Sequence, residues 1–201
     1  ALEQGAFILW NHPGWPDNKS TLYPVHEELL KANKIHGVEV LNHKEYYPVA
    51  FDWCNQYGIA PFANTDIHDL VSGCYGLEPG KMRPMTLVFA TERSEKGIKE
   101  ALFARRTAAL FDNKLVGKSE YLMKLIQSSL KIRRINAGTI EVTNISDIPY
   151  EMTNGGKLYI FPCRKTVRIG IPKEGALVFE NCFVGMNQKL SIPFEWWSSI
   201  L

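Results

Sequence analysis

Three short apolar runs that end in polar residues set the pattern of the first half of the chain. They cover residues 6–12, 37–42 and 59–65, and each has the length and composition of a buried strand. The stretches 23–33 and 46–57 between them carry apolar residues at helical spacing. Alternating strands and helices are typical of a parallel α/β sheet or barrel, whose strands share one rim at their carboxyl ends.

The pattern continues with a less regular segment. Residues 69–83 read as a long loop rich in Gly and Pro, and a loop of this length is usually functional or mobile. A strand is predicted over 85–90 and a helix over 94–106, with Ser94 as its N-terminal cap. An extended segment then runs over 107–117.

After about residue 119 the pattern changes from mixed to mainly strand-like. A short helix is predicted over 121–126, followed by strand-like runs that turn residues separate. These runs cover 130–135, 139–144, 157–161, 166–171, 176–179 and 189–194. Short strands without helices predict a small antiparallel, β-sandwich-like domain. We therefore place a domain boundary near 118, with an α/β part over 1–118 and an all-β part over 119–201.

Composition limits the classes of protein without choosing one. The chain has 201 residues, of which 45% are hydrophobic and 22% charged, and its formal net charge is +2. These values fit one large globular domain or two small ones, and give no reason to expect nucleic acid or a membrane surface as a partner. No apolar run approaches the roughly 20 residues of a membrane span. The opening Ala1–Gly5 looks like the end of a helix, so we expect a mature or proteolytic chain without its N-terminal portion.

The four cysteines contain no C-x-x-C pair, so a zinc site made of thiolates is not expected. Cys163 and Cys182 fall in strand-like stretches, and a disulfide between them stays an alternative. Cysteine usage leaves the redox compartment open. The expected setting is a bacterial protein, periplasmic or secreted.

Three residues at predicted strand ends are candidate metal ligands. Asp66 and His68 are two positions apart and therefore point to the same side of an extended chain. His12 ends the first apolar run in the same way. Imidazole and carboxylate are ligands of zinc, manganese and iron. The structural alternative is that His12 is a turn residue and that the Asp-x-His pair caps a helix.

Candidate substrate contacts come from amides and guanidinium groups. Asn11 and Asn42 lie at strand ends and could orient a substrate by hydrogen bonds, although turn chemistry explains them equally well. Arg106, with Arg83 and Arg105, offers the planar fork that matches phosphate oxygens. The alternative for Arg106 is the favourable position of a cation at the end of a helix.

Four further titratable residues are read as structural. Glu39 lies inside a predicted strand and is expected to support other groups rather than to bind metal. His26, His36 and His43 lack a partner at ligand spacing. His43 follows Asn42 and could reach the rim, but we expect it on the surface.

The motifs at 11–14, 37–42 and 64–68 resemble, in order, the late motifs of the polymerase and histidinol phosphatase (PHP) superfamily. The resemblance covers about residues 1–118. It implies a distorted (β/α)7 barrel, of which this chain holds the late strands only. It further implies two or three divalent metal ions (Zn, Mn or Fe), hydrolysis of a small phosphorylated substrate, and His12, Asp66 and His68 as metal ligands.

The chain departs from this family at its beginning. Such proteins start with a His-x-His strand and carry further His and Glu ligands before the His-Pro motif, but the eleven residues before His12 contain no His. The chain therefore looks like the second half of a PHP barrel with an added β domain. The first expectation is a metal-dependent phosphoesterase. The alternatives are a degenerate remnant that acts as a binding or structural module through its β domain, and a metal-dependent hydrolase of another bond, such as an amide. The oligomeric state is left open.

Overall fold

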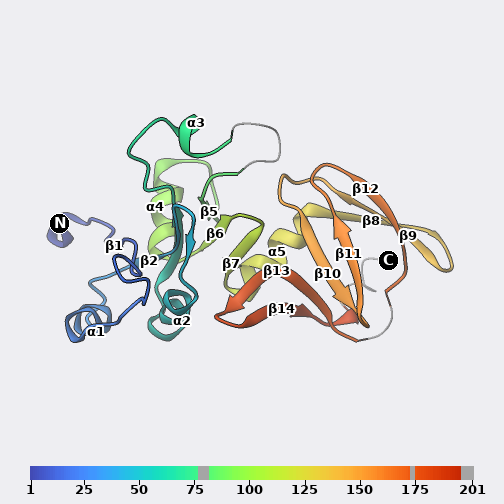
Figure 1. Cartoon of the computed structure of the whole chain (residues 1–201). Helices are drawn as coiled ribbons and strands as arrows, with labels where there is room; N and C mark the ends of the chain where they lie inside the picture. Colours follow the sequence, from blue (N-terminus) through green and yellow to red (C-terminus); the bar gives the residue numbers. More distant parts are fainter. Residues whose placement is uncertain (77–81, 173–174, 196–201) are drawn as a thin grey trace.

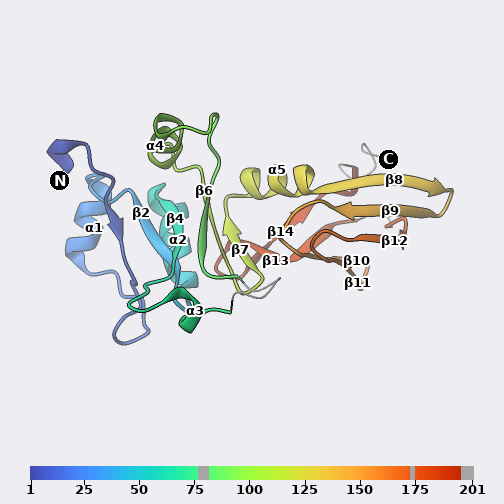
Figure 2. The same ribbon diagram turned by 90° about the horizontal axis from the view of Figure 1, so that it is seen from above.

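A computed structural model describes residues 1–76, 82–172 and 175–195. The molecule is elongated: the N-terminal residues lie at one end, and the strands of the second half lie at the other (Figures 1 and 2). None of the described helices is long and apolar enough to cross a membrane.

The first sheet carries the three predicted strand ends. β1 (Leu9–Trp10), β2 (Gly37–Asn42) and β4 (Ala60–Asn64) are parallel, with β2 in the centre, as the alternating pattern predicts. The short β3 (Glu45–Tyr46) returns antiparallel along the end of β2. The strand expected over 6–12 is shorter than predicted, because only Leu9 and Trp10 pair with β2.

Two helices connect these strands, and each begins with proline. α1 (Pro24–Lys31) and α2 (Pro48–Tyr57) both place proline in the first turn, where its missing N–H has no partner to lose. α2 buries Phe51 and Trp53 in one core with β2. The helix predicted to begin at 46 starts later, because Tyr46 belongs to β3.

The chain then forms a meander that leads to the second half. β5 (Met85–Val88), β6 (Thr107–Phe111) and β7 (Lys114–Gly117) are antiparallel neighbours. β7 also pairs, in parallel, with β13 (Leu177–Gly185). The seven-stranded sheet therefore takes strands from both sides of residue 118.

Side-chain hydroxyl groups connect the first sheet to this meander. Thr107 Oγ1 donates to the carbonyl oxygen of Pro61 at 2.8 Å. Thr86 Oγ1 accepts from the Ala63 N–H at 2.9 Å and donates to the Ala63 carbonyl oxygen at 3.0 Å. Pro61 has no N–H to donate to a neighbouring strand. The hydroxyl groups of Thr86 and Thr107 therefore supply hydrogen bonds that link β4 to β5 and β6.

Helix ends follow local sequence rules. α4 (Glu95–Phe103) is capped by Ser94, whose Oγ accepts from the Gly97 N–H at 3.0 Å, as predicted. The opening 3₁₀ turn η1 (Leu2–Gln4) ends at Gly5, which adopts a left-handed φ of 73°. That conformation is the C-cap predicted for the first residues.

The second half begins with a helix and a three-stranded antiparallel sheet. α5 (Ser119–Ser129) is longer than the helix predicted over 121–126, and leads into β8 (Leu130–Asn136). β9 (Thr139–Asn144) pairs with β8 on one side and β12 (Thr166–Gly170) on the other.

Three strands complete the large sheet around β13. β10 (Tyr150–Asn154) and β11 (Lys157–Phe161) form a hairpin beside β13, and β14 (Gln188–Ile192) pairs with the other edge of β13. β13 itself is longer than the strand predicted over 176–179, and β10 was not predicted.

One apolar core joins the second half to the meander. It contains Tyr150, Phe161 and Phe179 from the new strands, together with Leu110 and Leu115 from β6 and β7. The structure is thus a mixed α/β arrangement of sheets, and the core does not stop at residue 118. The boundary near 118, the (β/α)7 barrel and the sandwich remain predictions.

The alternative of a disulfide between Cys163 and Cys182 is wrong in this structure. All four cysteines are free. Cys163 lies in the turn after β11 rather than in a strand, whereas Cys182 is buried in β13 against β7. Burial raises the pKa of the Cys182 thiol to about 12, which keeps it protonated and unreactive near neutral pH.

Candidate functional site

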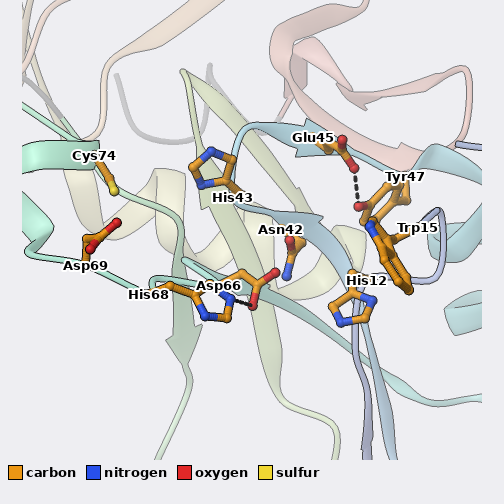
Figure 3. A pocket seen from close by; sticks show the side chains of 10 residues that line it. All are labelled: His12, Trp15, Asn42, His43, Glu45, Tyr47, Asp66, His68, Asp69 and Cys74. Atoms are coloured by element: carbon orange, nitrogen blue, oxygen red, sulfur yellow. Dashed lines mark hydrogen bonds and ion pairs between the residues drawn. The ribbon is translucent and has the colours of Figure 1, made fainter.

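A cavity of about 630 Å³ lies at the carboxyl ends of the parallel strands (Figure 3). Its described lining consists of His12, Trp15, Asn42, His43, Glu45, Tyr47, Asp66, His68, Asp69 and Cys74. These residues follow β1, β2 and β4, so the cavity occupies the rim where ligands bind in open α/β sheets.

All three candidate metal ligands line this cavity. Asp66 Oδ1 and His68 Nε2 are 3.5 Å apart, and the His68 side chain is 85% exposed. His12 lies beside Trp15 on the other side of Asn42 (Figure 3). Within the part of the chain that the structure describes, no three His, Cys, Asp or Glu side chains are close enough together to hold a metal ion. The three donors therefore share a cavity without forming a closed ligand shell.

Three cavity residues have a left-handed backbone. The φ angles of His12, His43 and Asp66 are 28°, 48° and 47°. Non-glycine residues adopt this region at a conformational cost, and such strain is often found at functional sites. Each of these residues follows a strand, so the unusual backbone turns its side chain at the rim of the sheet.

The buried carboxylate of Glu39 joins the three strand ends. It is 2% exposed. Oε2 accepts from the His12 backbone N–H at 2.5 Å and from Asn42 Nδ2 at 2.7 Å, and Oε1 accepts from Asn64 Nδ2 at 2.7 Å. Glu39 therefore fixes the positions at which β1, β2 and β4 end, in agreement with the supporting role that its place inside a strand suggested.

A glycine allows a tyrosine to approach the loop after His12. A Cβ on Gly14 would lie 2.4 Å from Tyr47 Cε1, so only glycine fits at this position. The Tyr47 hydroxyl donates to Glu45, and burial followed by this carboxylate raises the pKa of Tyr47. Tyr47 therefore remains a neutral hydrogen-bond donor at physiological pH.

His43, which we expected on the surface, is half-buried and lines the cavity at the rim, which was the alternative for it. Its Nδ1 is 3.1 Å from the Tyr75 hydroxyl, which also donates to the Thr65 carbonyl oxygen at 3.2 Å. A carbonyl oxygen can only accept, so if the Tyr75 proton goes to Thr65, the hydrogen bond between Tyr75 and His43 requires a proton on Nδ1 of His43. Tyr75 follows the short helix α3 (Val71–Cys74), which lies inside the predicted loop over 69–83; residues 77–81 of that loop lie outside the described residues.

Two of the predicted substrate contacts lie away from the cavity. Arg106 donates to the Phe89 carbonyl oxygen at 3.0 Å and pairs with Glu100. It precedes β6 at the level where β4 begins, which is the opposite end from the rim. Asn11 is exposed and outside the lining, whereas Asn42 lines the cavity with its amide held by Glu39.

The sequence analysis missed six of the ten described lining residues. Its missed members other than His43 are Trp15, Glu45, Tyr47, Asp69 and Cys74. They lie on loops and short elements, where hydrophobic periodicity carries no information. Their only signal was position, since each follows one of the three predicted strands within about a dozen residues.

Comparison with known proteins gives one informative match. No family model matches the chain, and no curated protein matches it. A crystal structure from Bacteroides vulgatus ATCC 8482 resembles it over 96% of this chain, with 31% sequence identity and a TM-score of 0.87. That protein is described as a two-domain protein containing a predicted PHP-like metal-dependent phosphoesterase. The present chain spans 62% of its length.

The chemistry of the donors fits a divalent metal, although the described set is incomplete. Two imidazoles and a carboxylate are the ligands that zinc, manganese and iron share. No Lys or Arg is among the described lining residues, while Glu45, Asp66 and Asp69 each bring a carboxylate. The site is therefore suited to cations.

Proposed function

We propose that this chain is part of a metal-dependent phosphoesterase that hydrolyses a small phosphate ester at the rim cavity. The observation that carries the proposal is that His12, Asp66 and His68, which are distant in sequence, line the same cavity. The similarity to the Bacteroides protein supports it, because that protein is described as metal-dependent.

Electrostatics favours metal ions as the groups that bind the phosphate. A phosphate ester is an anion, but the described lining offers it carboxylates and no lysine or arginine. A phosphoryl group binds in such a cavity only if cations offset the negative charge. We propose two or three divalent ions for this role, with His12, Asp66 and His68 among their ligands.

Several residues at the cavity then have distinct roles in the proposed reaction. When bound, the metal ions would activate a water molecule and stabilise charge on the phosphoryl oxygens. Glu39 holds the His12 backbone and Asn42 in place. The contact with Tyr75 holds the His43 ring in place, so that its Nε2 can form a hydrogen bond within the cavity.

Replacement of Asp66 tests this function. Asn tolerates the left-handed φ of 47° at this position, so Asp66→Asn removes the charge without adding backbone strain. We expect release of phosphate from monoester and diester substrates by the metal-loaded protein to fall at least about 100-fold. Asp112→Asn is the matched control, because Asp112 lies outside this cavity and pairs with the half-exposed Lys114. Equal activity of the two variants would contradict the role of Asp66.

A further inference from the structure

An exposed indole ring lies at one end of the cavity. Trp15 is 69% exposed, although large aromatic side chains are usually well buried. Its ring meets the His12 ring edge-on, with 5.7 Å between centroids, and its backbone N–H donates to the His12 carbonyl oxygen at 3.0 Å. The indole is thus held next to a candidate metal ligand with most of its surface available to a ligand.

The cavity walls are acidic. Glu45 lies near Trp15, and Asp69 lies at the far end beside Cys74 (Figure 3). No described lining residue is a lysine or arginine, so nothing in this lining would pair with a second anionic group on a ligand.

From these two observations we propose that Trp15 binds the alcohol part of the substrate, and that this part contains a ring and no negative charge. The proposal rests on the proposed function and adds the class of substrate to it. A phosphoryl group held by a metal ion at His12 would lie next to the Trp15 ring, so that the alcohol part of the ester could contact the indole face. Stacking on Trp15 favours a planar or apolar ring, while Glu45 and Asp69 repel a carboxylate or a second phosphate.

The kinetic test compares benzyl phosphate with ethyl phosphate in the full-length protein. Their leaving alcohols are similar in acidity, so the ratio of the two kcat/KM values reports the contact with the ring. We expect Trp15→Ala to lower this ratio roughly tenfold and Trp15→Phe to retain most of it. Tyr23→Ala removes another exposed aromatic ring, outside the cavity, and should leave the ratio unchanged.

The charge test uses 4-carboxybenzyl phosphate. We expect the wild-type protein to hydrolyse it at least several-fold less efficiently than benzyl phosphate, and Glu45→Gln, which keeps an acceptor for Tyr47, to reduce this discrimination. Discrimination that is absent, or that Glu45→Gln leaves unchanged, would overturn the part of the proposal that concerns charge.

A binding readout separates this proposal from the proposed function. Benzylphosphonate is not hydrolysed, and it should protect Trp15 fluorescence from iodide quenching more strongly than ethylphosphonate does. The difference between the wild-type protein and Trp15→Phe isolates the signal of this residue. Hydrolysis of both esters with a ratio that Trp15→Ala does not change, and no protection by benzylphosphonate, would overturn the proposal and leave the hydrolase. No hydrolysis of either ester and no phosphonate binding would overturn both.

Discussion

Among single residues, Glu39 has the most consequence for the site. It is a buried carboxylate that accepts three hydrogen bonds, each from a residue at the end of a different strand. A buried charge is tolerated when it is hydrogen-bonded in this way, and the donors in turn depend on it. The strained backbone of His12 is therefore stabilised by a group that does not itself line the cavity.

Removal of this carboxylate should destabilise the protein and disturb the rim. Glu39→Ala leaves the His12 N–H and two amide groups without their acceptor, so we expect a loss of about 3 kcal/mol or more in the free energy of unfolding. Urea denaturation measures this loss. Glu3→Ala, in the exposed opening turn, is the control and should change stability by less than about 0.5 kcal/mol. If Glu39→Ala lowered the free energy of unfolding by as little as Glu3→Ala does, the three hydrogen bonds to Glu39 would contribute little to stability.

For secondary-structure elements, the attachment of β1 depends on a histidine. The His36 backbone N–H donates to the Ile8 carbonyl oxygen at 2.9 Å, and His36 Nδ1 accepts from the Ile8 N–H at 2.8 Å. Burial, and to a lesser extent the Arg105 guanidinium, lowers the pKa of His36. Protonation of Nδ1 would remove the acceptor that holds the segment leading into β1.

Acidification should therefore loosen this segment. The unfolded chain takes up a proton on His36 as the pH falls through about 6.5, whereas the folded state resists it, so the free energy of unfolding should fall below that pH. Carboxylates whose pKa is lowered change the free energy of unfolding only at more acidic pH. Between pH 7 and 5, the pH dependence of stability therefore comes from the histidines. His36→Asn keeps an acceptor for Ile8 without a titratable group, and urea denaturation across this range should show a shallower pH dependence. Identical pH profiles would count against the role of His36.

The local sequence pattern predicted where the strands lie better than it predicted which strands pair with one another. β2 has the bounds expected from its apolar run, and β4 differs by a residue at each end. β10 was missed although Ser146, Asp147 and Pro149 mark a turn before it, because only Tyr150 and Met152 of its five residues are apolar. The parallel pairing of β7 with β13 joins residues more than sixty positions apart, and no local signal specifies such a contact.

In the whole molecule, the shared core argues that the two halves unfold together. Leu115 is buried in β7, opposite Cys182 of β13, in the core that also contains Tyr150 and Phe161. Leu115→Ala should therefore destabilise by about 2–5 kcal/mol and reduce amide protection in β6 and β13 alike. Hydrogen exchange with mass spectrometry measures this, with the half-exposed Leu158→Ala as control. Loss of protection confined to β5–β7 would instead favour independent domains divided near residue 118.

The site was predicted in part for the same physical reason as the fold. His12, Asp66 and His68 follow apolar strands, and parallel strands bring such ends to one rim, so their meeting in one cavity was predictable. Arg106 was predicted to contact the substrate because its guanidinium group matches phosphate, but the path of the chain puts it at the other end of the strands.

Metal content of the purified full-length protein tests the central claim most directly. Elemental analysis should find two or more equivalents of zinc, manganese or iron, and His68→Ala should lower this number. Because the His68 side chain is 85% exposed, its removal should not impair folding, and circular dichroism can verify this. Binding of no metal by the wild-type protein, even after supply of all three ions, would contradict the phosphoesterase proposal and favour a binding module.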